Sequence, residues 1–173
     1  MLYEFILIFH NWLRWIICFF LIVTILRSLN GVIKKKDFNK ADSFFSGILV
    51  GFSHLQLILG FSLYLFLSPF VNLELADFKT TVSNVMMRFW TLEHPTMMIL
   101  FVILVQASRI IVKRSDDPLK KHKKNLTFML ICVFILIAGS PWPFSKIQRP
   151  LFRSSLEKTK IYLETNNNLE RLS

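Results

Sequence analysis

Residues 5–26 read FILIFHNWLRWIICFFLIVTIL, and Arg14 is the one charged side chain among them. An α-helix needs about 20 mostly apolar residues to cross the hydrocarbon core of a membrane. The run has no basic residues before it and no small-residue cleavage site after it, so we expect it to stay in the mature protein rather than to be cleaved as a signal peptide. The sequence thus predicts a membrane helix from about residue 3 to residue 29.

Three further runs meet the same length requirement, at about residues 44–69, 89–112 and 126–144. The composition agrees, because 53% of the 173 residues are hydrophobic and only 18% are charged. A soluble domain carries about a quarter charged residues. We therefore predict an all-α integral membrane protein, with an antiparallel four-helix bundle over residues 1–144 and a polar, basic C-terminal tail over residues 145–173.

The basic residues lie mostly in the links between these runs, which bears on orientation. Lys34, Lys35, Lys36 and Lys40 lie in the first link and six basic residues in the third, whereas the few basic residues of the second link are offset by acidic ones. The positive-inside rule places the first and third links in the cytoplasm and both termini outside, although the basic tail disagrees. We therefore expect the basic residues behind the net charge of +10 to contact lipid headgroups rather than nucleic acid.

The tryptophans give a second indication of the threading. Trp12 and Trp15 lie near the start of the first run, Trp90 starts the third, and Trp142 ends the fourth. With alternating helix directions, all four fall at one membrane face, as in an interfacial aromatic belt.

Two histidines lie at a common depth in the predicted bundle. His10 and His94 each lie several residues inside the tryptophan-bearing end of a run, and their helices run in the same direction. Helical side chains tilt toward the N-terminus, so both imidazoles lean the same way. Two such histidines can bind a flat cofactor from both sides, as in bis-imidazole ligation of a b-type haem. We expect His10 and His94 to be the metal ligands.

A third histidine, His54, lies near the bilayer midplane in the second run, which points the opposite way. Its imidazole leans away from the other two, so one iron does not easily bind His54 together with either of them. By spacing, Gly47, Gly51 and His54 share a helix face, and small residues there let a planar ring or another helix approach closely. Two interpretations of this face stay open: it contributes to a cofactor site, or it packs against another helix.

Arg14 and Glu93 are the charged residues nearest the histidine pair. Arg14 lies one turn beyond His10, and Glu93 immediately precedes His94. An unpaired ion in lipid is costly. We expect an Arg14–Glu93 ion pair as the simplest arrangement. The alternatives are an Arg14 that faces a haem propionate and a Glu93 that accepts from the His94 ring.

Pro95 directly follows His94 and lacks an N–H. Proline removes a helical hydrogen bond and disfavours helical geometry in the preceding residue. The third helix is therefore predicted to kink at His94 or to restart there with Pro95 in its first turn.

Other residues have simpler interpretations. Met97 and Met98 offer thioether ligands that suit copper, but without a spaced methionine array they are better explained as packing residues. His122 lies in a Lys-His-Lys run and is expected to be a solvated residue of a basic loop. Cys18 and Cys132 lie in apolar runs without a C-x-x-C pair, which excludes a zinc ribbon and a covalently attached c-type haem.

Four short motifs resemble a family of bacterial four-helix membrane proteins called cytochrome b or cytochrome-b-like. They are HNWLRW at residues 10–15, HLQLILGFSLY at 54–64, EHPTMM at 93–98 and PWPF at 141–144. The likeness covers about residues 1–144. It implies a non-covalent haem b protein of the inner membrane, with His10, His54 and His94 at the family's histidine positions.

Three functions follow from these patterns. The leading one is a b-type haem protein of the bacterial inner membrane that transfers electrons, with quinol as a reasonable donor and other membrane redox subunits as partners. The second is a haem-free structural or assembly subunit of a larger membrane complex. A small transporter ranks last, because the sequence has one helix break and no internal repeat. No soluble-enzyme motif is present, so an electron carrier or subunit is favoured over a stand-alone enzyme.

Overall fold

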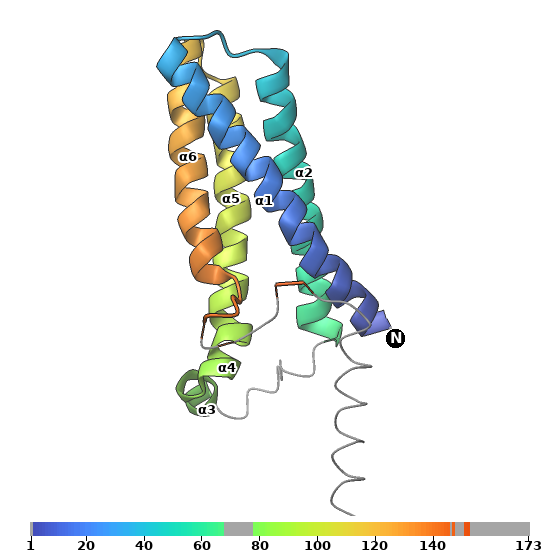
Figure 1. Cartoon of the computed structure of the whole chain (residues 1–173). Helices are drawn as coiled ribbons and strands as arrows, with labels where there is room; N and C mark the ends of the chain where they lie inside the picture. The colour runs from blue at the N-terminus through green and yellow to red at the C-terminus, as the bar shows by residue number, and fades with distance from the viewer. Residues whose placement is uncertain (1, 68–77, 146, 148–150, 153–173) are drawn as a thin grey trace, which may run out of the picture.

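The computed structural model describes residues 2–67, 78–145, 147 and 151–152, among which there is no strand. Four long helices form an antiparallel bundle (Figure 1): α1 (Leu2–Lys34), α2 (Lys40–Ser62), α5 (His94–Lys113) and α6 (Pro118–Gly139). In the bundle, α1 packs against α2 and α6, and α5 packs against the same two helices from the other side. The predicted all-α four-helix bundle is confirmed, whereas the predicted tail lies almost wholly outside the described residues.

All four helices are long and apolar enough to cross a membrane. Two of them extend beyond their regular part, since α2 continues through η1 (Leu63–Leu67), and α5 is preceded by α4 (Val85–Arg88) and η2 (Phe89–Glu93). A short helix, α3 (Phe78–Ser83), lies before α4. Large apolar side chains are exposed along each of the long helices, as expected of surfaces that face lipid. The chain is a multi-pass membrane protein.

The link between α1 and α2 is fixed by hydrogen bonds around one carboxylate. Asn39 caps α2 by accepting from Asp42 N at 3.1 Å, and Asp42 Oδ2 accepts from Asn39 N at 2.9 Å. Arg27 Nε of α1 donates to Asp42 Oδ1 at 2.8 Å. This capping box therefore also joins the C-terminal part of α1 to the start of α2.

Helix α6 begins eight residues earlier than predicted and ends five residues earlier. Asp117 caps it by accepting from Lys120 N at 3.0 Å, and Pro118 fits the first turn, where no N–H is needed. The same Lys120 N–H lowers the pKa of Asp117. The helix ends at Gly139 because Ser140 precedes Pro141, which disfavours helical geometry there.

The early start of α6 makes the prediction for His122 wrong. His122 is helical and only 1% exposed, and its ring centroid lies 5.0 Å from that of Phe38. A Cβ on residue 31 would overlap the imidazole, so Gly31 lets α1 lie directly over the ring. Within the described residues neither ring nitrogen has a hydrogen-bond partner. The basic run is thus the first part of a helix with one side turned into the bundle.

One turn beyond His122, a buried polar contact joins three helices. Asn125 Nδ2 donates to Ser28 Oγ at 2.8 Å, and Ser108 Oγ donates to Asn125 Oδ1 at 3.0 Å. All three side chains are at most 2% exposed. Because each acceptor and donor is paired inside the protein, the contact joins α1, α5 and α6 without leaving a polar group in lipid.

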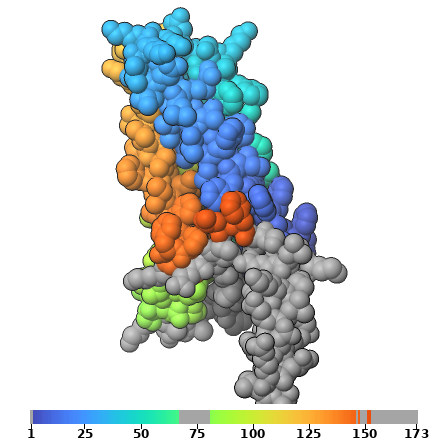
Figure 2. Space-filling view, viewed as in Figure 1, coloured from blue at the N-terminus to red at the C-terminus, as the bar shows by residue number. Residues whose placement is uncertain are grey.

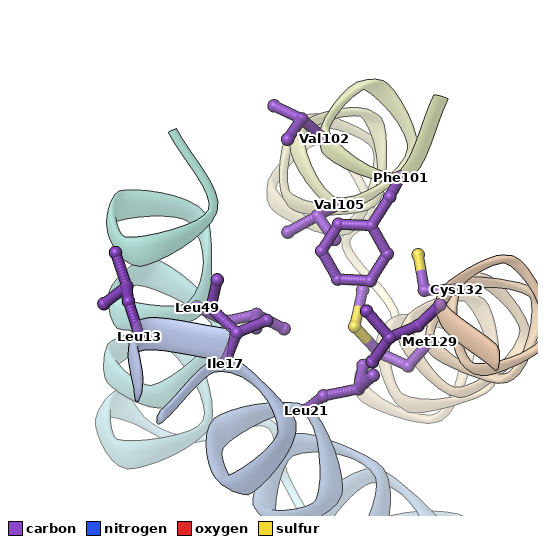
Figure 3. Packing of buried hydrophobic residues seen from close by; sticks show 10 residues of the cluster. Leu13, Ile17, Leu21, Leu49, Phe101, Val102, Val105, Met129 and Cys132 are labelled. Carbon is purple, nitrogen blue, oxygen red and sulfur yellow. The ribbon is translucent and has the colours of Figure 1, made fainter. Parts of the chain in front are cut away.

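Below this contact, toward the tryptophan-bearing end, lies the apolar core (Figure 3). Leu21 of α1, Leu49 of α2, Val105 of α5 and Met129 of α6 are each at most 2% exposed. Figure 3 shows these side chains converging from four helices, with Cys132 among them as a buried packing residue. The core separates the polar contact at the basic end from the opposite end of the bundle.

Replacement of Gly31 by Ala tests the packing of α1 on His122. We expect Gly31→Ala to lower the free energy of unfolding by about 1–3 kcal/mol, because the added methyl group overlaps a fully buried ring. Gly51→Ala is the matched control: a Cβ there meets nothing within 4 Å, so stability stays unchanged or rises slightly. Denaturant unfolding of the two variants in detergent measures both effects, and equal stability would contradict the packing.

Candidate functional site

A cavity of about 160 Å³ lies between the four long helices at the tryptophan-bearing end. Most of its wall is apolar, with side chains such as Leu7, Leu57 and Val102. Its polar wall includes imidazole, amide and guanidinium groups, which belong to His10, Asn11, Arg14, Gln56 and His94. Such a cavity, apolar with a few convergent polar groups, is the usual form of a ligand site.

The wall contributed by α5 has an irregular backbone. The turn η2 is π-helical, and the N–H of His94 donates to Phe89 O instead of to Trp90 O. Helix α5 then starts at His94 with Pro95 in its first turn, which confirms the predicted restart. Because Pro95 has no N–H, the carbonyl of Thr91 loses its helical donor. Tyr64 supplies the replacement, since its hydroxyl donates to Thr91 O at 3.0 Å.

The cavity brings His10 and His94 together. Their ring centroids are 6.4 Å apart and their ring planes make an angle of 70°. His94 also packs against the rings of Phe89 and Trp90, at 5.8 and 5.6 Å between centroids. The predicted pairing of two histidines from the first and third spans at one depth is therefore present in the structure.

The tautomer of His94 is fixed by the backbone of α6. His94 Nδ1 lies 2.6 Å from the carbonyl oxygen of Gly139, and a carbonyl can only accept, so Nδ1 carries the proton. A neutral His94 therefore keeps its lone pair on Nε2. Only glycine allows this contact, because a Cβ at position 139 would lie 2.5 Å from Met97 Cβ and 2.7 Å from Met98 Cε. Metal-binding histidines commonly donate their second nitrogen to a carbonyl in this way.

The surroundings of His10 come from α2. Gln56 Nε2 donates to the backbone oxygen of His10 at 3.0 Å. One turn further along α2, Gly60 lies close to the imidazole, where a Cβ would be 3.3 Å from His10 Cε1. His10 Nδ1 is buried and has no partner among the residues that the structure describes.

Three further polar atoms of the cavity residues share this property. The atoms Asn11 Oδ1, Arg14 Nε and Gln56 Oε1 are buried and unpartnered in the described part of the chain. Buried polar atoms in proteins are almost always hydrogen-bonded to protein, water or a ligand. The cavity wall therefore offers hydrogen-bonding atoms that a water or a ligand can pair.

The predicted Arg14–Glu93 ion pair is wrong. Glu93 is exposed and pairs with Arg88, whose Nε lies 2.7 Å from Glu93 Oε1. The π-helical turn explains this choice, since it brings residues five apart onto one side of the helix. The alternative in which Glu93 holds the His94 ring is wrong as well, because Gly139 O takes that place.

Arg14 instead lies among aromatic rings, and its residue is 8% exposed. Its guanidinium carbon is 5.2 Å from the ring centroid of Trp15 and 5.5 Å from that of Trp142. Arg14 Nη2 donates to the carbonyl oxygen of Leu151 at 2.9 Å, and Trp15 Nε1 donates to the same oxygen at 3.0 Å. Figure 2 shows the segment after α6, in orange to red, against α1, in blue.

His54 and Gly51 lie outside the cavity. Both are exposed on the outer side of α2, where His54 Nδ1 donates to Val50 O of its own helix at 2.9 Å. Gly47 is covered by the guanidinium of Arg109, which in turn donates to Ser43 O at 2.8 Å. Of the face predicted from the glycine spacing, Gly47 thus packs against α5, whereas Gly51 and His54 are exposed, and neither part lies at the histidine pair.

Four contacts of the site were not foreseen from the sequence. They involve Tyr64, Gly60, Gly139 and Leu151. The missing N–H of Pro95 was a usable signal for a free carbonyl at Thr91, but nothing in the sequence indicated that Tyr64 would fill it. The partners of the others depend on the tertiary structure.

The described residues contain no group of three or more His, Cys, Asp or Glu side chains able to hold a metal ion. Met98 also lines the cavity, but its methyl group packs beside Gly139.

No protein-family model, curated protein or solved structure matches the chain.

A double-mutant cycle tests the bond between Tyr64 and Thr91. Tyr64→Phe alone leaves a partly buried carbonyl unpaired and is expected to cost about 1 kcal/mol of unfolding free energy. In a Pro95→Ala background, residue 95 has an N–H for Thr91 O, so the same change is expected to cost little. Denaturant unfolding of the four proteins gives the coupling, and strictly additive effects would contradict the bond.

Proposed function

We propose that this protein is a membrane-embedded b-type haem protein that transfers electrons, and that His10 and His94 would hold the haem iron. The observation that carries the proposal is the pair of imidazoles across one apolar cavity, with the His94 ring oriented by Gly139 O. The resemblance of the four sequence motifs to the cytochrome-b-like family supports the same proposal.

The separation of the rings supports ligation of one ion. A metal–imidazole bond is about 2.0 Å long and a ring nitrogen lies about 1.2 Å from the ring centroid, so two imidazoles on one ion would have centroids at most roughly 6.4 Å apart. The centroids of His10 and His94 are 6.4 Å apart. The distance between the two rings is therefore compatible with one ion bound by both.

When bound, haem b supplies one-electron chemistry at its iron. The residues of this chain hold and tune it. Gly139 O fixes the proton on His94 Nδ1 and keeps Nε2 available, while the apolar wall excludes water. The nearby cation of Arg14 favours the more reduced state, so its charge is expected to raise the reduction potential.

The cellular setting belongs to the same proposal. We place the chain in the bacterial inner membrane with the α1–α2 and α5–α6 links in the cytoplasm and both termini outside, on the basis of the lysine-rich links. The cavity then lies at the outer side. Quinol is the proposed donor because it is the mobile reductant of the bilayer, and other membrane redox subunits are the proposed partners.

One observation favours a second function, that of a haem-free structural or assembly subunit of a larger membrane complex. His54 and Gly51 are exposed on the outer side of α2. A polar imidazole with small residues beside it is a typical contact between membrane helices. A partner subunit on this face would explain both residues without any cofactor.

Visible spectroscopy separates the two functions. We expect the detergent-purified protein to show a b-type α-band in the reduced-minus-oxidised spectrum, with about one haem per chain by pyridine haemochrome assay. His10→Ala and His94→Ala should each lower the haem content about tenfold or more, because each removes an imidazole that would hold the iron. His54→Ala is the matched control and should retain the wild-type spectrum, since His54 lies outside the cavity.

A folded, colourless protein that takes up no added haem would contradict the haem proposal and favour the function as a structural or assembly subunit. A copper signal that depends on His10, His94 and Met98 would instead indicate a copper site.

Cysteine labelling tests the orientation. We expect a membrane-impermeant maleimide to label Ser83→Cys on intact spheroplasts and Asp37→Cys only after permeabilisation, because Asp37 lies in the basic α1–α2 link. The unaltered chain is the control, since Cys132 is buried and Cys18 is partly buried within the bundle. The reverse labelling pattern would overturn the assignment.

A further inference from the structure

We infer that Arg14 is a carboxylate-binding residue of the cavity and that it binds an acidic side chain of the cofactor. This inference rests on the proposed haem function, because haem b carries two propionates. It assigns a role to the one buried cation on the described cavity wall.

The first ground is the charge of Arg14. Its residue is 8% exposed, and the ion pairs found among the described residues are Arg27–Asp42 and Arg88–Glu93. Glu93, the acidic residue nearest His94 in the sequence, is therefore already used by Arg88. A buried cation without an anion is strongly unfavourable, and sites of this kind usually serve a charged ligand.

The second ground is the hydrogen bonding of the guanidinium. Nη2 donates to a neutral acceptor, the carbonyl oxygen of Leu151, and Nε is buried with no partner in the described part of the chain. Trp15 Nε1 donates to the same oxygen as Arg14 Nη2. Leu151 O thus occupies two donors, and Arg14 Nε is the donor left for a charged acceptor such as a carboxylate oxygen.

The third ground is position. Arg14 lies one helical turn from His10 and lines the same cavity as the two histidines. Trp15 and Trp142 lie within 5.5 Å of its guanidinium carbon and restrict where the group can turn. A ligand held by His10 and His94 therefore meets this cation at its edge, where a porphyrin bears its propionates. Leu151 then completes the site from the segment after α6.

The experiment compares haem b with its dimethyl ester, in which both carboxylates are neutral. Each is titrated into haem-free, detergent-purified full-length protein and followed by the Soret band. We expect the wild type to bind haem b at least about tenfold more tightly than the ester, because a charge-assisted hydrogen bond is lost with the ester. Arg14→Met should bind the two with equal affinity.

Arg109→Met is the matched control, since Arg109 bonds to Ser43 O on the outer side of α2 and does not line the cavity. It should keep the wild-type preference. Equal binding of haem b and ester by the wild type would overturn the inference while leaving the haem function intact, and so would an Arg14→Met protein that keeps the preference. If Arg14→Met does not fold, the wild-type comparison alone decides. Absence of binding for both compounds would overturn the haem function itself.

Discussion

The hydrogen bond from His94 Nδ1 to Gly139 O joins the first residue of α5 to the last residue of α6, and much of the cavity depends on it. It requires glycine at position 139, because Met97 and Met98 occupy the space that a side chain would need. It also requires α5 to begin at His94, which Pro95 ensures. Once the bond is made, His94 Nε2 is the only nitrogen of that ring left to bind a ligand, and it belongs to a ring that lines the cavity.

Polar groups inside a membrane must be paired within the protein. This constraint divides the bundle into layers. At the basic end, Asn125 joins Ser28 and Ser108, and His122 lies buried one turn away. At the other end lies the cavity with its unpartnered polar atoms. The apolar core, with Leu21, Leu49 and Met129, lies between these two ends.

The sequence predicted those features that depend on the order of residues along one helix. Four apolar runs sufficed for the bundle, and equal depth sufficed to bring His10 and His94 together. The restart at Pro95 followed from its missing N–H. Boundaries were less accurate: the lysines near His122 suggested a loop, whereas Asp117 and Pro118 start the helix before them.

Features that depend on which helix face turns inward could not be predicted in the same way. Glu93 lies at a suitable depth for an ion pair with Arg14, but the π-helical turn places its carboxylate beside Arg88, with which it pairs instead. The side on which His54 lies was undecidable, because α2 is apolar around most of its circumference. Tyr64 and Gly60 entered the site only through the packing of α2 on its neighbours.

The contrast between His54 and His94 bears on whether the two proposed functions exclude each other. Each ring bonds a backbone carbonyl through Nδ1, but His54 bonds Val50 of its own helix whereas His94 bonds Gly139 of a neighbouring one. The bond of His94 turns its ring into the bundle, and that of His54 leaves its ring on the outer surface of α2. A group bound to Nε2 of His54 must therefore come from outside the bundle. A partner on that surface and a cofactor between His10 and His94 occupy separate places, so one chain can do both.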